Sequence, residues 1–185
     1  MEKSNMDRKE IKRKRLKTTT SEEYRFVEKL LTASFPADEY RPLEEQRRNV
    51  ESIDMFHMNI LFAGEESAGL LSYWQFEEFV YVEHFAVLPT LRGKGYGCEA
   101  ISGLIKEKGR IVLEVELPTD DLSRRRITFY TRCGLTLSPE EYIQPAYRAG
   151  GNEIPMRLMY CGVDMEQDYE QIKSSIYRTV YGKST

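Results

Sequence analysis

The sequence predicts one α/β domain in which a mostly antiparallel sheet is followed by a helical segment. Two patterns carry this prediction. Three apolar, aromatic-rich runs follow one another through short connections, which is typical of antiparallel hairpins. A glycine-rich turn then leads into a helical pattern and a further strand, and such a unit pairs its strands in parallel with a right-handed crossover. No linker or internal repeat divides the 185 residues, a length that suits one domain.

A basic strand and a helix open the chain. Residues 8–17 carry seven Lys or Arg residues, and we interpret them as a strand with a solvated basic face; the alternatives are a disordered tail and a nucleic-acid-binding arm. Thr20 and Glu23 have the spacing of a capping box. Apolar residues then recur at helical spacing, at Tyr24, Val27, Leu30 and Leu31. This helix must end before Pro36, and the mostly polar residues 42–50 predict a second, short helix.

Three strands follow these helices. Residues 55–63, 68–76 and 79–88 are apolar and rich in aromatic residues, and only residues 64–67 and 77–78 separate them. Such short connections join antiparallel neighbours. The three runs therefore predict consecutive hairpins.

A glycine-rich turn connects these hairpins to the next helix. It reads Arg92-Gly93-Lys94-Gly95-Tyr96-Gly97, and apolar residues recur at helical spacing beyond it. The first N–H groups of a helix have no partner within it, and together with the helix dipole they favour a bound phosphate. Glycines let the backbone approach a bulky anion, and Arg92 and Lys94 add positive charge. The pattern predicts an anion-binding turn; the alternative is a tight connection without a ligand.

The segments after this turn continue the α/β order. Gly109 ends the helix, and residues 110–117 form the next strand. A short helix covers residues 123–133. Residues 142–148 and 154–161 then form a hairpin around a glycine-containing loop.

The last helical pattern lies beyond the strand-forming segments. Residues 164–180 present one apolar face, made of Tyr169, Ile172, Ile176 and Val180. We therefore expect residues 1–162 to form the main domain. Residues 163–185 are expected to form a helical extension that packs on this domain or on a partner.

The composition excludes several classes of protein. The chain is 41% apolar and 31% charged with a net charge of −3, which favours a globular protein without a nucleic-acid partner. Its three cysteines contain no C-x-x-C pair, so we expect free thiols in the cytoplasm and no structural metal site. No apolar run has membrane-spanning length, and the N-terminal residues are too polar for a signal peptide. We expect no membrane partner.

The order of elements and two motifs resemble the GNAT family of acetyl-coenzyme A-dependent N-acetyltransferases, in particular bacterial members without an evident substrate signature. The family signature Gln/Arg-x-x-Gly-x-Gly/Ala stands here as residues 92–97. Downstream, Tyr130 and Gly134 match a second family motif, in which Ser123 replaces the usual Asn. The resemblance covers residues 9–161. It implies a mixed, mostly antiparallel sheet of about seven strands, with a V-shaped splay between strands 4 and 5, helices on both faces and an extra C-terminal helix.

The resemblance also implies how acetyl-coenzyme A is bound as co-substrate. The pyrophosphate would lie on the backbone of the glycine turn, and the pantetheine would pair with the edge of the fourth strand. The cofactor-binding residues implied in this way are Phe85, Ala86, Val87, Arg92, Gly93, Lys94, Gly95, Tyr96, Gly97 and Ser123.

Acetyl transfer needs a proton donor for the departing thiolate. A thiol has a reference pKa of about 8.5 and a tyrosine of about 10, so a tyrosine can fill this role. The resemblance assigns it to Tyr130. The alternative is that Tyr130 packs in the core beside Phe129.

The reaction also needs a base for the amine. The candidates lie on two predicted strands and are Glu83, His84, Glu114 and Glu116. Because side chains alternate along a strand, at most one of Glu83 and His84 is expected to face the substrate. We prefer Glu83 as the base, acting directly or through water. The alternative is a Glu83 that pairs with an arginine across the sheet, and His84 is interpreted as a core or edge histidine.

These patterns predict an N-acetyltransferase that acts on a primary amine of a small molecule or peptide by direct attack in a ternary complex. The alternative is a GNAT-like module that binds acyl-coenzyme A without turnover, as a sensor or interaction partner. A dinucleotide-binding protein is disfavoured because Cys98 occupies the position of the last glycine in G-x-G-x-x-G. The acceptor stays open, and a homodimer is an expectation from the resemblance.

Overall fold

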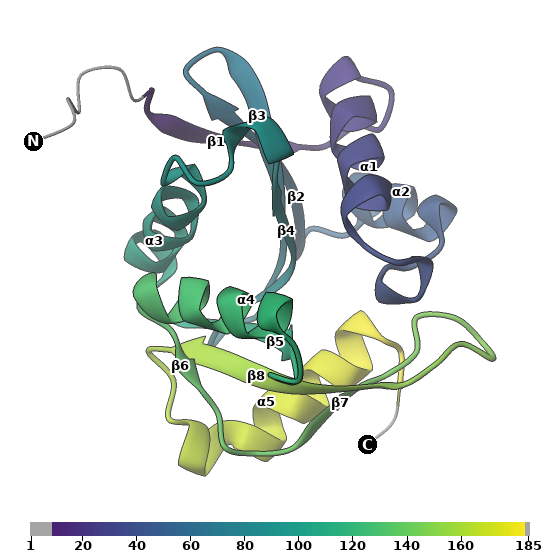
Figure 1. The fold of residues 1–185 in the computed structure, drawn as a ribbon. Coiled ribbons are helices and arrows are strands. Elements are labelled where there is room, and N and C mark those ends of the chain that lie inside the picture. Colours follow the sequence, from purple (N-terminus) through teal and green to yellow (C-terminus); the bar gives the residue numbers. More distant parts are fainter. Residues whose placement is uncertain (1–8, 184–185) are drawn as a thin grey trace, which may run out of the picture.

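A mixed sheet of eight strands runs through the whole molecule (Figure 1). The computed structural model describes residues 9–183. Residues 1–8 and 184–185 lie outside this range. They include Arg8 of the basic stretch, the start of the predicted domain 1–162 and the end of the predicted extension 163–185. The strands are β1 (Ile11–Leu16), β2 (Phe56–Ala63), β3 (Glu66–Gln75), β4 (Val80–Val87), β5 (Ile111–Glu116), β6 (Thr136–Leu137), β7 (Tyr142–Gln144) and β8 (Ile154–Cys161). Their order in the sheet is β1-β2-β3-β4-β5-β8-β6, with β7 paired to β8.

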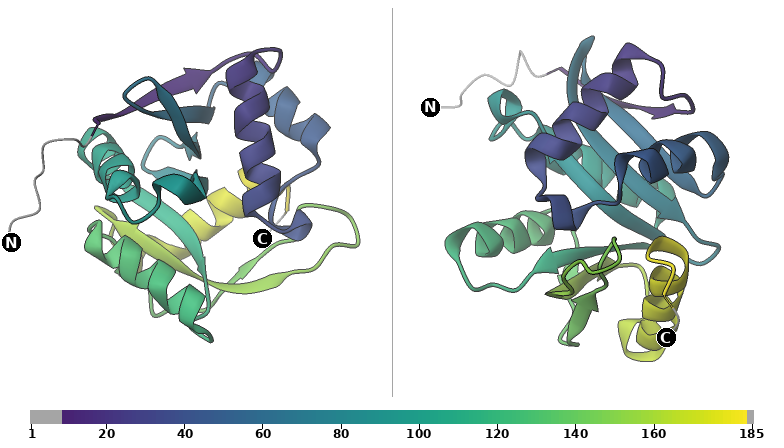
Figure 2. Two further views of the ribbon diagram at one scale, coloured as in Figure 1. Left: turned by 45° about the horizontal axis from the view of Figure 1, so that its top comes forward. Right: turned by 90° about the vertical axis from the view of Figure 1, so that its right-hand side faces the viewer.

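Helices cover both faces of the sheet. They are α1 (Glu22–Ser34), α2 (Leu43–Ser52), α3 (Tyr96–Lys108), α4 (Asp121–Arg132) and α5 (Met165–Val180), with short 3₁₀ turns at Ala37–Glu39 and Pro89–Leu91. Residues of α1, α2 and α5 share one core cluster, and residues of α3 and α4 share another on the opposite face (Figure 2). Within residues 9–183, none of the helices is both long and apolar enough to cross a membrane.

Strands β4 and β5 part soon after they meet. Their parallel pairing is confined to residues 80–82 of β4 and 111–113 of β5. On its other side β4 stays paired with β3, but Ser72 lies opposite His84 while Tyr73 lies opposite Val82. Glu83 is therefore the extra residue of a β-bulge. The mixed sheet and its splay confirm the predicted fold class, and the two-residue strand β6 accounts for an eighth strand.

Two local expectations differ from the structure. The N-cap of α1 is Ser21, whose hydroxyl accepts from the backbone N–H of Tyr24, so Thr20 does not begin a capping box. The strand expected over residues 142–148 ends at Gln144. The chain then leaves the sheet, and the Tyr147 hydroxyl donates to the Glu83 carboxylate of β4.

Helix α5 packs on the sheet rather than projecting from it. Its apolar face lies in the same core cluster as α1 and β4, through Met165, Tyr169, Ile172, Ile176 and Val180. Tyr181, the residue that follows the helix, is also buried there. The C-terminal extension therefore contributes to the main core.

Gly69 of β3 offers a test of how closely β3 and β4 pack. A Cβ at this position would lie 2.4 Å from the backbone oxygen of Ala86, which cannot move without disturbing β4. We expect Gly69→Ala to lower the free energy of unfolding by about 2–3 kcal/mol. Urea unfolding monitored by circular dichroism measures the change.

Gly103 supplies the matched control. It lies exposed within α3, and a Cβ there meets nothing within 4 Å. Gly103→Ala should raise stability by up to about 1 kcal/mol, because alanine loses less backbone entropy in a helix. Equal stability of the two variants would contradict the close approach of β4.

Candidate active site

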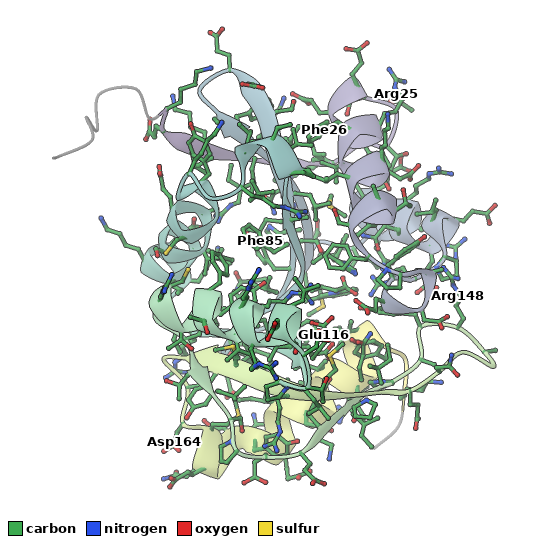
Figure 3. The ribbon with its side chains drawn as sticks, viewed as in Figure 1. Arg25, Phe26, Phe85, Glu116, Arg148 and Asp164 are labelled. Atoms are coloured by element: carbon green, nitrogen blue, oxygen red, sulfur yellow. The ribbon has the colours of Figure 1, made fainter. Side chains whose placement is uncertain are left out.

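A cavity of about 610 Å³ lies where β4 and β5 separate. Phe85 of β4 and Glu116 at the end of β5 both contribute to its lining (Figure 3). The glycine turn forms another part of the wall, and Tyr130 of α4 and Tyr147 from the loop after β7 complete it. The splay of the two strands is therefore the reason that an opening exists within the sheet.

The glycine turn presents the start of α3 to this cavity. Gly95 is the N-cap of α3 with φ 84°, and Gly93 has φ 74°, both in the left-handed region that favours glycine. Gly93, Gly95 and Gly97 all line the cavity, as does Cys98 in the first turn of α3. An anion in this part of the cavity would meet the positive end of the helix dipole.

Most of the predicted cofactor-binding residues meet in this cavity. Those that line it are Phe85, Ala86, Val87, Arg92, Gly93, Gly95 and Gly97. Lys94 is exposed and does not line it. Tyr96 packs instead in a small apolar cluster with Leu91.

Ser123 has a structural environment of its own. It is the third residue of α4 and forms a capping box with Asp120: its backbone N–H donates to the Asp120 carboxylate at 2.8 Å, and its Oγ accepts from the Asp120 N–H at 3.2 Å. The Ser123 Oγ also donates to the Asp120 carbonyl. Ser123 is 3% exposed and does not line the cavity.

Tyr130 both packs beside Phe129 and lines the cavity. It contacts the ring of Phe129 edge to face, with centroids 5.0 Å apart, and it also lines the cavity. Burial raises the pKa of Tyr130 well above the ordinary tyrosine value. The hydroxyl is therefore protonated at neutral pH.

The bulge at Glu83 overturns the expected alternation along β4. Glu83 and His84 both line the cavity, and the His84 Nδ1 lies 3.9 Å from a Glu83 carboxylate oxygen. An extra residue in a strand shifts the alternation by one, which is why both side chains reach the same space.

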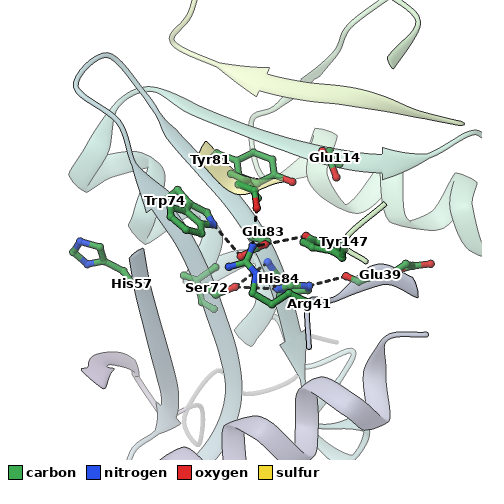
Figure 4. A network of polar contacts seen from close by, with 12 residues as sticks. Glu39, Arg41, His57, Ser72, Trp74, Tyr81, Glu83, His84, Glu114 and Tyr147 are labelled. Carbon is green, nitrogen blue, oxygen red and sulfur yellow. Dashed lines mark hydrogen bonds and ion pairs between the residues drawn. The ribbon is translucent and has the colours of Figure 1, made fainter. Parts of the chain in front are cut away.

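His84 is a buried histidine with hydrogen bonds on both ring nitrogens. Nδ1 lies 3.3 Å from the Ser72 hydroxyl and Nε2 lies 2.9 Å from the carbonyl oxygen of Glu39 (Figure 4). Burial lowers the pKa of His84, so the neutral ring is favoured. This environment agrees with the interpretation of His84 as a core histidine.

Glu83 is surrounded by three donors. Its carboxylate accepts from the Arg41 guanidinium, from the Tyr147 hydroxyl at 2.9 Å and from the Trp74 indole N–H at 3.0 Å (Figure 4). The Glu83 and Arg41 side chains are 0% and 1% exposed. The pairing with an arginine considered above is thus present, although Arg41 comes from the loop before α2 and not from the sheet.

Within residues 9–183, the hydrogen bonds that Glu114 accepts through its carboxylate come from tyrosine hydroxyl groups. Its carboxylate accepts from the Tyr142 hydroxyl and, at 2.9 Å, from the Tyr181 hydroxyl. Burial raises the pKa of Glu114 to about 7, although these hydrogen bonds act in the opposite direction. Glu116, its neighbour on β5, is ion-paired with Arg126.

Four residues around the two buried carboxylates were missed in the sequence: Arg41, Tyr142, Tyr147 and Tyr181. They come from loops and element ends outside both family motifs. Tyr181 lies one residue beyond the apolar face of the last helix, and this is the only local signal that points to any of them. Across residues 9–183, no group of three His, Cys, Asp or Glu residues is arranged to hold a metal ion.

Comparisons with known proteins agree with this geometry. A family model described as the acetyltransferase (GNAT) family matches residues 21–135. The Bacillus subtilis (strain 168) protein named "Putative acetyltransferase YjbC" is 32% identical over 98 residues, which is 51% of this chain and 51% of that protein. The chain thus matches about half the length of this curated relative.

Solved structures extend the likeness over almost the whole chain. A structure titled "Putative acetyltransferase from GNAT family", from Bacteroides thetaiotaomicron, is 43% identical with a TM-score of 0.90, and the match covers 94% of this chain and 99% of that one. A Bacillus subtilis acetyltransferase in complex with CoA shares the fold at 16% identity and a TM-score of 0.56, over 84% of this chain and 99% of that one. The family model covers more than half of the residues, and the chain therefore belongs to the acetyltransferase (GNAT) family of acyltransferases.

Proposed function

We propose that the protein transfers an acetyl group from acetyl-coenzyme A to a primary amine of a small molecule or peptide, by direct attack in a ternary complex. The observation that carries this proposal is one continuous cavity that joins the glycine turn to the buried carboxylates between β4 and β5. Bound at the turn, acetyl-coenzyme A would supply an activated acyl group. The amine would then enter from the side of the carboxylates.

The residues along the cavity fit such a ligand. Beyond Val82, the edge of β4 that faces β5 has no strand partner among residues 9–183, so its backbone groups can pair with the amides of pantetheine. The open backbone of the glycine turn suits a pyrophosphate, because a Cβ built at Gly93 meets nothing within 4 Å. Arg92, whose Nε donates to the Val87 carbonyl, adds positive charge near this edge.

Tyr130 is the proton donor for the departing thiolate in this proposal. Its support is a position on the cavity wall and a hydroxyl that carries its proton at neutral pH, although burial makes this hydroxyl a weaker acid than an ordinary tyrosine. An amine nitrogen bonds to the acyl carbon as the carbon–sulfur bond breaks, and a proton from Tyr130 completes the thiol.

Glu83 has weaker support as the base than its place on the cavity wall suggests. Its carboxylate is already paired with the buried guanidinium of Arg41. Protonation of Glu83 would remove the buried counter-charge of that guanidinium, which is costly in a buried site. Within residues 9–183 it would leave only the more exposed Glu45, 3.9 Å from the Arg41 Nε. We therefore propose that Glu83 fixes Arg41 and Tyr147 beside the cavity.

Isothermal titration with acetyl-coenzyme A tests the binding part of the proposal. The folded protein should bind acetyl-coenzyme A and desulfo-coenzyme A but not NADH. Gly95→Asp should weaken binding by about 100-fold or more, because it adds a negative charge and strains a φ of 84° at the anion-binding turn.

Gly109→Asp is the matched control for this titration. Gly109 also has a positive φ, but it lies at the other end of α3 and away from the cavity lining. The affinity of the Gly109→Asp variant for acetyl-coenzyme A should match that of the wild type. Failure of the folded wild type to bind, or equal binding of NADH, would rule out the proposed co-substrate.

Tyr130→Phe tests the chemical step. Amine-dependent thiol release, measured with a panel of primary amines, should fall on the order of 100-fold, because the proton donor is lost. The affinity for acetyl-coenzyme A should stay within about two-fold, since the ring remains in place.

Tyr24→Phe is the comparison for this variant, because Tyr24 is a buried tyrosine of α1 that does not line the cavity. Its rate of thiol release should equal that of the wild type. An unchanged rate in Tyr130→Phe would remove Tyr130 from the acid role. Tight acetyl-coenzyme A binding without turnover of any amine in the wild type would favour the alternative of a non-catalytic acyl-coenzyme A sensor.

A further inference from the structure

Four carboxylates line the cavity, and their partners differ. Glu83 is paired with Arg41, and Glu116 is paired with Arg126. A carboxylate beside a guanidinium is stabilised in its ionised form and is a poor proton acceptor. Two of the four carboxylates therefore already form ion pairs with arginines.

Glu114 differs from this pair because neutral donors hold it. The hydroxyls of Tyr142 and Tyr181 donate to its two oxygens, and the Tyr181 hydroxyl lies 3.2 Å from that of Tyr81. These donors fix the orientation of the carboxylate without supplying a counter-charge. Glu114 is the negative group in the cavity with both a defined geometry and no cationic partner among the described residues.

Glu39 is the remaining carboxylate in the lining. It is half-buried, and within residues 9–183 no hydrogen bond fixes its carboxylate, although its backbone carbonyl contacts His84. A proton acceptor must be held within reach of the proton that it removes. Glu39 is thus the less suitable of the two unpaired carboxylates, and it supplies a competing variant for the test.

We infer that Glu114 takes the proton from the acceptor amine, and that Tyr181 from the C-terminal extension holds it in position. This inference rests on the proposed function. An ammonium group that enters the cavity would form an ion pair with Glu114. Transfer of one proton turns that pair into a neutral amine and a neutral carboxylic acid, a change that a desolvated site favours.

The protons balance across the reaction. The ammonium group carries three protons. The first passes to Glu114 and later to solvent, and the second remains on the amide nitrogen. The third leaves the nitrogen as the carbon–nitrogen bond forms. It replaces the proton that Tyr130 has given to the thiolate. The nitrogen lone pair released by Glu114 forms the new bond, and the sulfur keeps the electrons of the carbon–sulfur bond.

The groups that face Glu114 act on its pKa in two opposite directions. They come from β4, β7, the loop after β7 and the C-terminal helix with the residue after it, and they are Tyr81, Glu83, Tyr142, Tyr147, Tyr177 and Tyr181. Burial and the charge of Glu83 raise the pKa of Glu114, and the hydroxyl donors lower it. The resulting pKa of about 7 suits a group that accepts protons near neutral pH.

The pH dependence of turnover tests the role of Glu114. The wild-type kcat/KM should fall on the acid side with a midpoint near 7. Glu114→Gln should lower the rate on the order of 100-fold at pH 7 and remove this limb, so that the residual rate keeps rising with pH as free amine accumulates. Its affinity for acetyl-coenzyme A should stay at the wild-type value.

Tyr181→Phe tests the positioning role. The variant loses one hydroxyl that stabilises the ionised carboxylate, so the acid limb should move up by about one pH unit. Tyr169→Phe is the matched control: it removes a hydroxyl from helix α5 that donates to the Glu141 carbonyl and does not contact Glu114. The limb should not move in this control.

Thermal unfolding gives a readout that needs no substrate. A carboxyl whose pKa is raised in the folded state contributes stability below its unfolded value of about 4.5, and that contribution is lost as the pH rises toward 7. The Tm of the wild type should therefore fall relative to Glu114→Gln between pH 4.5 and 7. A Tm difference that is independent of pH would contradict the buried, proton-accepting carboxylate.

The outcomes separate the two levels of inference. A wild type that binds acetyl-coenzyme A and acetylates an amine, with an acid limb that survives in Glu114→Gln or disappears instead in Glu39→Gln, would overturn the role of Glu114 and leave the proposed function intact. A folded wild type that does not bind acetyl-coenzyme A would remove both. Loss of the limb in Glu114→Gln together with its upward shift in Tyr181→Phe would support the inference.

Discussion

The early end of the pairing between β4 and β5 is the constraint on which the rest of the structure depends. Two strands in the middle of a sheet cannot separate without leaving backbone N–H and C=O groups that need other partners. The bulge at Glu83 lies where the separation begins, and the glycine turn lies where β4 leads into α3. The opening thus combines unpaired strand edge, helix N-terminus and cavity in one place.

The two buried glutamates at this opening have different kinds of partner. Glu83 is paired with the guanidinium of Arg41, whereas Glu114 is held by tyrosine hydroxyls and has no cationic partner within residues 9–183. An ion pair and a hydroxyl-bound carboxylate differ in how easily they accept a proton, because only the first loses a charge–charge attraction on protonation. Two glutamates on neighbouring strands can therefore have different chemistry.

Local patterns in the sequence were sufficient for most of the elements and for the glycine turn, because turn glycines and helical periodicity depend on residues close together in the chain. The bulge was not predictable in this way. The extra residue is visible only in the register between Ser72 and His84, so the alternation rule failed at the point where the site lies. Contacts such as Arg41 with Glu83, or Tyr181 with Glu114, join distant parts of the chain and leave no periodic trace.

The tyrosines around Glu83 and Glu114 come from two parts of the sequence, with Tyr81 in the first part. The family model ends at residue 135, whereas Tyr142, Tyr147 and Tyr181 follow it. The segment that supplies these three tyrosines is thus separate along the chain from the segment that forms the glycine turn. Exchange of residues 136–183 between relatives would therefore replace these three tyrosines and leave the glycine turn unchanged.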